Sequence, residues 1–326
     1  MILQGIGKLV LVKEKEFLIY NILKERKDAR MECKGIITAM VTPMTENQEL
    51  DFPATKILIN QLINQGVDGL FILGTNGEAH LLDKEEKIEF AKLVVKQVDN
   101  RIPVYVGVGG NSTRETIELA IKMEGIGADA LSVITPYFVS LTQSELVAHY
   151  KATAEAVSIP LIIYNMPKLT GINVAPKTVA ELAKIKNMIG IKDSSGNLEN
   201  MKSYIEATRN ETFSVLSGSD SLVLDGLECG GSGAVTGISN LFPELFVMIY
   251  QNWLKGNLEL SRKKQSEIEP FRGILRLGTV PSVLKESMNI AGISVGPARL
   301  PAMSPNEEVI KAIKDIIFKY KEMRRA

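Results

Sequence analysis

The sequence is poor in cysteine and histidine. Among its 326 residues are two cysteines, Cys33 and Cys229, and two histidines, His80 and His149. The cysteines lie far apart and form no CxxC pair, which indicates reduced thiols, and we expect a cytoplasmic protein. Because histidine and cysteine form no cluster, we expect no dedicated metal site and no other cofactor.

An excess of charge and a long hydrophobic run are also missing. The chain has 38 lysines and arginines against 38 aspartates and glutamates, and no run of one sign is long enough to cover a face. This balance argues against nucleic acid and against an acidic membrane surface as the main partner. No unbroken apolar stretch is long enough to cross a bilayer. We therefore expect small molecules and further copies of the same chain as partners.

The first 32 residues differ from the rest of the chain. Charged residues interrupt their apolar patches, and no small-residue cleavage site follows one of these patches. A second methionine, Met31, stands just before the first convincing strand. We interpret residues 1–32 as an accessory N-terminal extension, or even as a start assigned too early. A docking segment is the alternative.

From Gly35 onward one unit repeats: a short apolar run, a loop with glycine or proline, and a longer helical pattern. Strands are expected at 36–41, 69–73, 104–108, 130–134, 161–164, 189–192, 213–217 and 233–236. Eight such strands close a (β/α)8 TIM barrel, and their apolar composition fits a sheet that helices cover from outside. We expect this barrel to span residues 33–256 and a C-terminal helical region to span residues 257–326.

Helical patterns lie between the strands and continue after the last one. Asp83 with Glu86, and Ser112 with Glu115, have the spacing of capping boxes. Helices are expected at 83–97, 112–126, 144–156, 175–186, 243–255, 257–268, 280–290 and 306–323. A doubly wound open sheet is the main alternative. The glycine-rich segments 108–111 and 229–233 lack the G-x-G-x-x-G spacing of a phosphate loop, so we interpret both as tight turns.

A lysine follows the sixth strand directly. Segment 188–197 places Lys192 after an apolar run and on the same strand face as Gly190, a glycine that would leave room beside the amine. A lysine among apolar side chains loses solvation of its charged form, which makes the neutral, nucleophilic amine more available. A lysine that ends a strand and extends into solvent is the structural alternative.

Other polar groups are expected at the same end of the barrel, where the loops after the strands meet. The loop Gly74-Thr75-Asn76-Gly77-Glu78 has paired glycines that let backbone N–H groups converge on a carboxylate. Tyr164 ends the fifth strand, next to the strand of Lys192, and Ser217-Gly218-Ser219-Asp220 ends the seventh. An amine, a nearby proton carrier and a carboxylate cradle suit a Schiff-base enzyme acting on an α-keto acid.

These residues also carry a resemblance to a known family. The loop 74–78, and the motif Tyr164-Asn-Met-Pro-x-x-Thr-Gly followed by Gly-Ile-Lys192-Asp-Ser, resemble two signatures of the dihydrodipicolinate synthase/N-acetylneuraminate lyase family of pyruvate-dependent class I aldolases. The likeness runs from about Gly35 through the C-terminal helices. It implies a lyase of the TIM-barrel fold that uses a lysine–pyruvate Schiff base.

The resemblance assigns a role to each site residue. Lys192 forms an imine with the keto carbon of pyruvate or of a 2-oxo-3-deoxy acid, and Tyr164 moves the proton of the C4 oxygen. Thr75 and Asn76 hold the pyruvyl carboxylate. Two further positions, Gly218 and Val235, line the pocket. Relatives assemble as homotetramers built from tight dimers, and we expect the same here.

The sequence departs from the synthase pattern at three positions. Leu169 stands where the synthase has an arginine for the second substrate, and leucine offers no donor fork for a carboxylate. Phe138 stands where the synthase has a second relay tyrosine, and Asn76 replaces the second of two threonines. With Ser194 and Asp220 as candidates for binding sugar hydroxyls, these differences favour a 2-keto-3-deoxy sugar acid lyase. A turn cap and a solvated acid are the structural alternatives for those two residues.

Two other functions stay open. One is 4-hydroxy-tetrahydrodipicolinate (dihydrodipicolinate) synthase, which condenses pyruvate with aspartate semialdehyde. The other is a non-catalytic barrel that binds keto acids, an alternative that the missing relay tyrosine keeps open.

Overall fold

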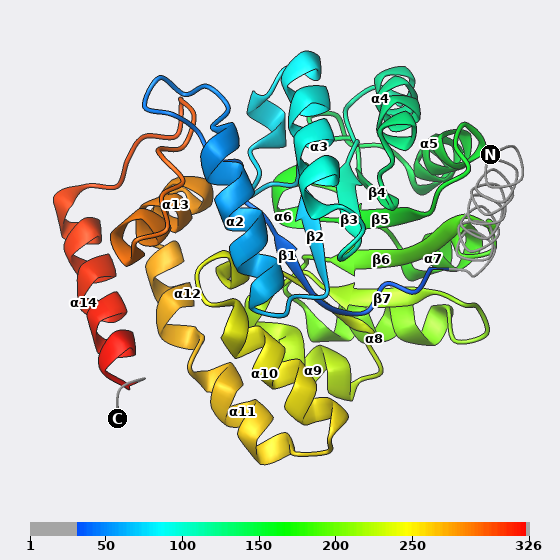
Figure 1. Ribbon diagram of the computed structural model, residues 1–326. Coiled ribbons are helices and arrows are strands. Elements are labelled where there is room, and N and C mark those ends of the chain that lie inside the picture. Colours follow the sequence, from blue (N-terminus) through cyan, green and yellow to red (C-terminus); the bar gives the residue numbers. More distant parts are fainter. Residues whose placement is uncertain (1–30, 324–326) are drawn as a thin grey trace, which may run out of the picture. The chain divides into compact units, whose positions relative to one another are not determined.

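The computed structural model describes residues 31–323 of the chain, and eight parallel strands within it form one closed barrel (Figure 1). The strands are β1 (Gly35–Ala39), β2 (Gly69–Ile72), β3 (Val104–Gly107), β4 (Ala130–Ile134), β5 (Leu161–Asn165), β6 (Met188–Asp193), β7 (Ser214–Ser217) and β8 (Gly233–Thr236). Each strand pairs with the next, and β8 pairs with β1. The predicted (β/α)8 barrel is therefore confirmed. The predicted extension at residues 1–32 lies almost wholly outside the described residues.

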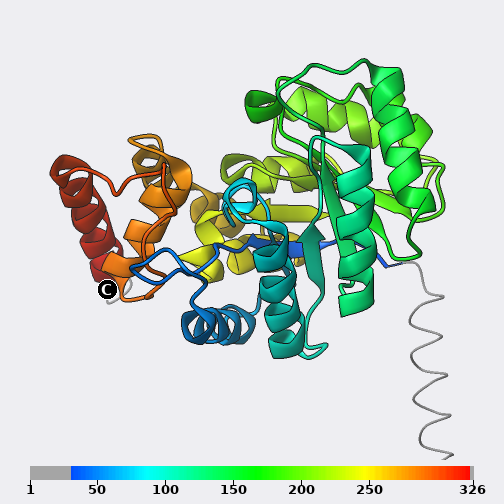
Figure 2. The same cartoon turned by 90° about the horizontal axis from the view of Figure 1, so that it is seen from above.

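Helices alternate with the strands and cover the outside of the barrel (Figures 1 and 2). They are α2 (Phe52–Asn64), α3 (Lys84–Val98), α4 (Thr113–Ile126), α5 (Gln143–Glu155), α6 (Pro167–Thr170), α7 (Pro176–Leu182), α8 (Leu198–Ala207), α9 (Val223–Glu228), α10 (Pro243–Leu254), α11 (Leu258–Ser266), α12 (Glu269–Leu275), α13 (Val280–Ala291) and α14 (Glu307–Met323), with 3₁₀ turns η1 (Ala79–Leu81), η2 (Asp220–Leu222) and η3 (Ile238–Asn240). No helix within residues 31–323 is long and apolar enough to cross a membrane.

The predicted helix starts are set by side-chain caps. At the start of α3, Asp83 accepts a hydrogen bond from the Glu86 N–H, and the Glu86 side chain accepts one from the Asp83 N–H, so the capping box is complete. Ser112 caps α4 through the Glu115 N–H alone. Such caps satisfy N–H groups that the first turn of a helix leaves without a partner.

The C-terminal helices α12, α13 and α14 lie together at one side of the barrel in both views (Figures 1 and 2). An aromatic cluster joins them to the barrel helices, since the rings of Phe271 on α12 and Tyr320 on α14 each pack against Phe242 with centroids 4.2 Å apart. The sequence pattern did not predict α12, because this seven-residue helix contains a proline and a glycine. The boundary placed at residue 256 stays a prediction.

The close approach of β6 and β7 requires a glycine. A Cβ atom at Gly190 would lie 2.6 Å from the carbonyl oxygen of Ser214, its partner on β7. The space beside this glycine is therefore filled by the neighbouring backbone. This differs from the expectation that Gly190 leaves room for a substrate next to Lys192.

We predict that Gly190→Ala lowers the midpoint of thermal unfolding, because the added methyl group must displace the Ser214 carbonyl. Overpacking of this kind costs roughly 1 to 3 kcal/mol. The matched control is Gly125→Ala within α4, where an added Cβ has nothing within 4 Å and alanine favours the helix by about 1 kcal/mol. Circular dichroism measures both midpoints. An unchanged midpoint for Gly190→Ala would contradict the close strand approach.

Candidate active site

Lys192 occupies the end of β6, and its amine lies inside the barrel. The side chain is only 4% exposed. Its Nζ atom lies 4.0 Å from the ring centroid of Tyr164 and 4.4 Å from that of Phe71, so two aromatic rings from other strands cover it. The alternative of a lysine extended into solvent does not fit this position. The Lys192 amine is thus enclosed by other parts of the protein.

Tyr164 lies beside Lys192 because β5 and β6 are parallel and pair regularly from Ile162 onward, after a register shift between Leu161 and Ile162. The two residues are direct partners across the strand pair, and residues paired in this way point to the same side of a sheet. The Tyr164 hydroxyl lies 3.1 Å from the hydroxyl of Thr75, close enough for a hydrogen bond with either group as donor. Amine, phenol and threonine hydroxyl thus form a continuous row.

The loop after β2 presents free N–H groups next to this row. Two non-glycine residues in left-handed backbone conformation flank it, Leu73 at φ 55° and Glu78 at φ 54°. Neither the Thr75 nor the Asn76 N–H donates a hydrogen bond to another described residue. Converging N–H groups of this kind bind anions. Both N–H groups are thus available for the carboxylate cradle that the sequence predicts, and their role in holding a carboxylate stays a prediction.

A cavity of about 440 Å³ opens beside the row. Thr75, Tyr164 and Leu169 are predicted site residues that line it, together with Phe71. Lys192 is not among the residues that line this cavity, but its amine lies against the Phe71 and Tyr164 rings, which do line it.

Asn76 and Asp220 lie close together on another side of the site. A Cβ atom at Gly237 would lie 2.7 Å from Asn76 Nδ2 and 3.6 Å from Asp220 Oδ2, so both side chains adjoin this glycine. Asp220 Oδ1 accepts a hydrogen bond of 2.9 Å from the Gly237 N–H. Burial raises the pKa of Asp220 to about 6, while the N–H groups of Gly237 and Ile238 and the charges of Arg272 and Lys192 lower it. Asp220 is thus not the freely solvated acid of the structural alternative.

Gly218, Ser194 and Val235 have packing roles in the free protein. A Cβ atom at Gly218 would clash with the Ser194 hydroxyl and would lie 3.0 Å from the Asp193 carbonyl oxygen and 3.1 Å from Lys192 Cε, so the close packing of β6 against this residue requires glycine. The Ser194 hydroxyl donates to the Gly218 carbonyl at 3.3 Å and ties the ends of β6 and β7 together. Val235 is buried on β8. None of the three lines the cavity described above.

Sequence reasoning missed a polar network at the ends of β5 and β6. Asp193 accepts hydrogen bonds from the Asn165 side chain at 2.9 Å, from the Ser195 N–H and hydroxyl at 3.1 and 2.8 Å, and from the Asn200 side chain at 3.2 Å. Asn165 and Asp193 directly follow Tyr164 and Lys192 and are themselves partners across the strand pair. The sequence did contain a signal for this network, because a polar residue follows each of the two candidate catalytic residues.

A second missed residue is Ser132, whose hydroxyl is buried and has no hydrogen-bond partner among the described residues. It lines the cavity from β4. Its only sequence signal was a serine inside an apolar strand.

Side chains of His, Cys, Asp and Glu within residues 31–323 form no group of three that could hold a metal ion.

The fold and this arrangement define a TIM barrel with a lysine-centred site at the carboxyl ends of its strands. The chain belongs to the dihydrodipicolinate synthetase family, whose model matches residues 32–319.

Individual relatives cover nearly the whole barrel and the C-terminal helices. The 4-hydroxy-tetrahydrodipicolinate synthases of Archaeoglobus fulgidus and Syntrophus aciditrophicus are 37% and 38% identical; the matches cover 87% and 88% of this chain and 97% and 98% of the relatives. YagE, an E. coli K12 prophage protein of the dihydrodipicolinic acid synthase family solved in complex with pyruvate, superposes with a TM-score of 0.85 at 34% identity, covering 88% of this chain and 98% of its own. These names do not support the expectation that the chain is closer to sugar acid aldolases than to the synthase.

We predict that Asp220→Asn changes how stability depends on pH. A carboxyl whose pKa is raised by folding binds its proton more tightly in the folded state, so its contribution to stability falls as pH rises from about 4 to about 6. Asparagine does not titrate. Relative to the variant, the wild type should lose free energy of unfolding on the order of 2 kcal/mol between pH 4 and pH 7. Urea unfolding across this range measures the difference, and parallel curves would refute a raised pKa.

Proposed function

We propose that the chain is a Schiff-base enzyme that joins pyruvate to an aldehyde, or reverses that reaction, with Lys192 as nucleophile. The observation that carries this proposal is the enclosed Lys192 amine beside Tyr164, whose hydroxyl meets Thr75 at 3.1 Å. Family membership and the relative solved with pyruvate support it.

The site residues can be assigned to successive steps. The neutral Lys192 amine adds to the keto carbon of pyruvate, and loss of water with uptake of one proton leaves a protonated imine that draws electrons from the methyl carbon. Loss of a proton from that carbon gives an enamine, which attacks the aldehyde. Tyr164 donates the proton to the new C4 oxygen, and the Thr75 and Asn76 N–H groups hold the carboxylate. Water then releases the product from Lys192.

The names of the relatives favour aspartate semialdehyde as the aldehyde, which makes 4-hydroxy-tetrahydrodipicolinate synthase the first candidate reaction. A specific observation favours the second candidate, a 2-keto-3-deoxy sugar acid lyase. Leu169 is 58% exposed and lines the cavity, where the synthase pattern has an arginine. An apolar side chain there offers a carboxylate no partner but does not exclude an uncharged hydroxyaldehyde.

Self-association is a further part of the proposal. Phe138 is 97% exposed and has φ 80°, a left-handed conformation that is strained for a bulky residue. It adjoins Tyr137, which lines the cavity. A second copy of the chain covering this loop, within the expected homotetramer, would remove the exposed ring from water.

The test of the proposed function is reductive trapping. Incubation with pyruvate and borohydride should leave a stable adduct on Lys192, located by peptide mass spectrometry, and Lys192→Met should form none. The non-catalytic barrel predicts binding of pyruvate without an adduct. An adduct on any other lysine, or none in the wild type, would overturn the assignment.

Leu169→Arg tests which aldehyde is used. Because an arginine can bind a carboxylate through two hydrogen bonds, we predict that this variant raises kcat/KM for aspartate semialdehyde about tenfold or more and impairs cleavage of 2-keto-3-deoxy sugar acids. Leu169→Met, which keeps the apolar surface, is the matched control. Pyruvate release and condensation are assayed side by side. If neither rate changes, residue 169 does not face the second substrate.

A further inference from the structure

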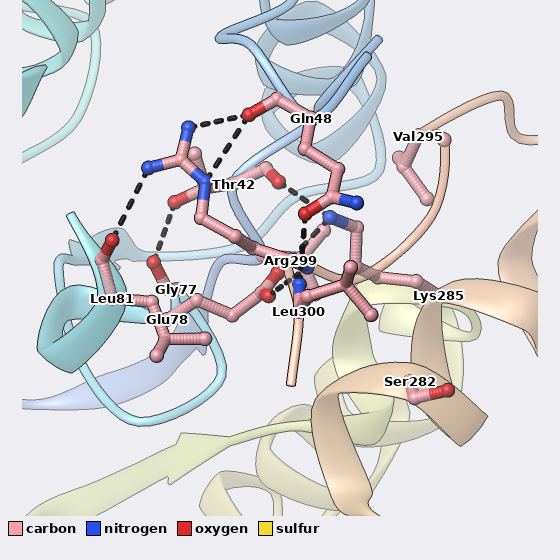
Figure 3. Close-up of polar contacts among 12 residues, drawn as sticks. Thr42, Gln48, Gly77, Glu78, Leu81, Ser282, Lys285, Val295, Arg299 and Leu300 are labelled. Atoms are coloured by element: carbon pink, nitrogen blue, oxygen red, sulfur yellow. Dashed lines mark hydrogen bonds and ion pairs between the residues drawn. The ribbon is translucent and has the colours of Figure 1, made fainter. Parts of the chain in front are cut away.

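Glu78 closes the carboxylate cradle, yet its side chain is directed to the C-terminal part of the chain (Figure 3). It is fully buried. Its Oε1 atom accepts a hydrogen bond of 3.0 Å from Lys285 on α13, and its Oε2 atom accepts one of 2.7 Å from the Arg299 backbone N–H. Each carboxylate oxygen therefore has a donor from beyond the barrel.

Lys285 reaches the cradle by a second route as well. Its buried amine also donates to the carbonyl oxygen of Thr42, after β1, at 2.9 Å. The Thr42 hydroxyl in turn donates to the carbonyl oxygen of Gly77 at 2.7 Å. One ammonium group thus fixes two consecutive cradle residues, Gly77 through Thr42 and Glu78 directly (Figure 3).

The Arg299 side chain holds the segments around the cradle. Its guanidinium group binds both carboxylate oxygens of Glu86 at 2.7 Å. It also donates to the carbonyl oxygens of Gln48, in the loop before α2, and of Leu81, directly after the cradle. Arg299, in the C-terminal segment, therefore holds both the loop that contains Gln48 and the 3₁₀ turn that follows the cradle.

Stability alone is a weak reason for the buried pair of Glu78 and Lys285. Removing two charges from water offsets most of their attraction, and an apolar pair of similar volume often stabilises a fold equally well. A buried pair with single donors on defined oxygens does, however, select one loop geometry. In this loop, that geometry decides where the Thr75 and Asn76 N–H groups point.

We propose that Lys285 is a positioning residue that acts through Glu78 to hold the cradle in the conformation that binds the substrate carboxylate. The C-terminal helices then have a part in substrate binding although none of their residues lines the cavity. The proposal rests on the proposed function, because it takes the carboxylate of pyruvate as the bound group.

The test compares two ketones that differ in the carboxylate. Borohydride trapping at Lys192 is measured against concentration for pyruvate and for acetone, which has the ketone alone. For Lys285→Met, the half-saturating pyruvate concentration should rise tenfold or more while the trapping rate at saturation stays near that of the wild type. Trapping of acetone should not change.

Two further variants complete the design. The electroneutral double variant Glu78→Gln/Lys285→Met leaves no unpaired buried charge, so it carries the test if Lys285→Met does not fold, and it should show the same selective loss. Arg262→Met is the control. Arg262 on α11 forms an ion pair of 2.8 Å with Glu228, its side chain is more than half exposed, and neither residue belongs to the cradle. This control should match the wild type with both ketones.

The outcomes separate the two proposals. An unchanged pyruvate dependence, or an equal loss with pyruvate and acetone, would show that Lys285 does not position the cradle. A wild type that pyruvate does not label at Lys192 would overturn the proposed function instead.

Discussion

The register between β5 and β6 is the constraint on which the site depends. Parallel pairing sets Tyr164 directly beside Lys192 and Asn165 directly beside Asp193. The first pair faces the barrel interior with its amine and phenol, and the second locks the strand ends through the Asp193 hydrogen bonds. A slip of one residue would turn each side chain to the opposite face. The placement of both pairs therefore follows from one strand pairing.

Three ionisable side chains of the described site each lie against a defined neighbour. The Lys192 amine lies against two rings, Asp220 accepts from the Gly237 N–H, and Glu78 is satisfied from beyond the barrel. In a medium of low dielectric, an unpaired charge would be costly and would not keep one position. The C-terminal helices thus contribute to order at the cradle as well as to the apolar core.

Much of the site was readable from sequence because its residues occupy strand ends and the loops that follow them. Lys192, Tyr164 and Thr75 fall at such positions, and the alternation of a strand gives the direction of each side chain. The preference for sugar acids rested on three departures from the synthase pattern and on two candidate hydroxyl-binding residues, and the relatives' names do not support it. The side chain at residue 169 shows that this position cannot bind a carboxylate. It does not specify which aldehyde enters the cavity.

The sequence by itself determined the eight strands and which of them carry Lys192 and Tyr164 at their ends, because apolar runs, caps and strand periodicity are local properties; closure into a barrel was a prediction that the pairing of β8 with β1 confirmed. Only the tertiary structure decided which distant groups meet. Lys285 contacts Glu78 across more than two hundred residues, and Gly190 is needed for the backbone of β7. Contacts of this kind depend on how the folded chain brings the C-terminal segment against the loop after β2. No local sequence pattern shows that residues so far apart in the chain are in contact.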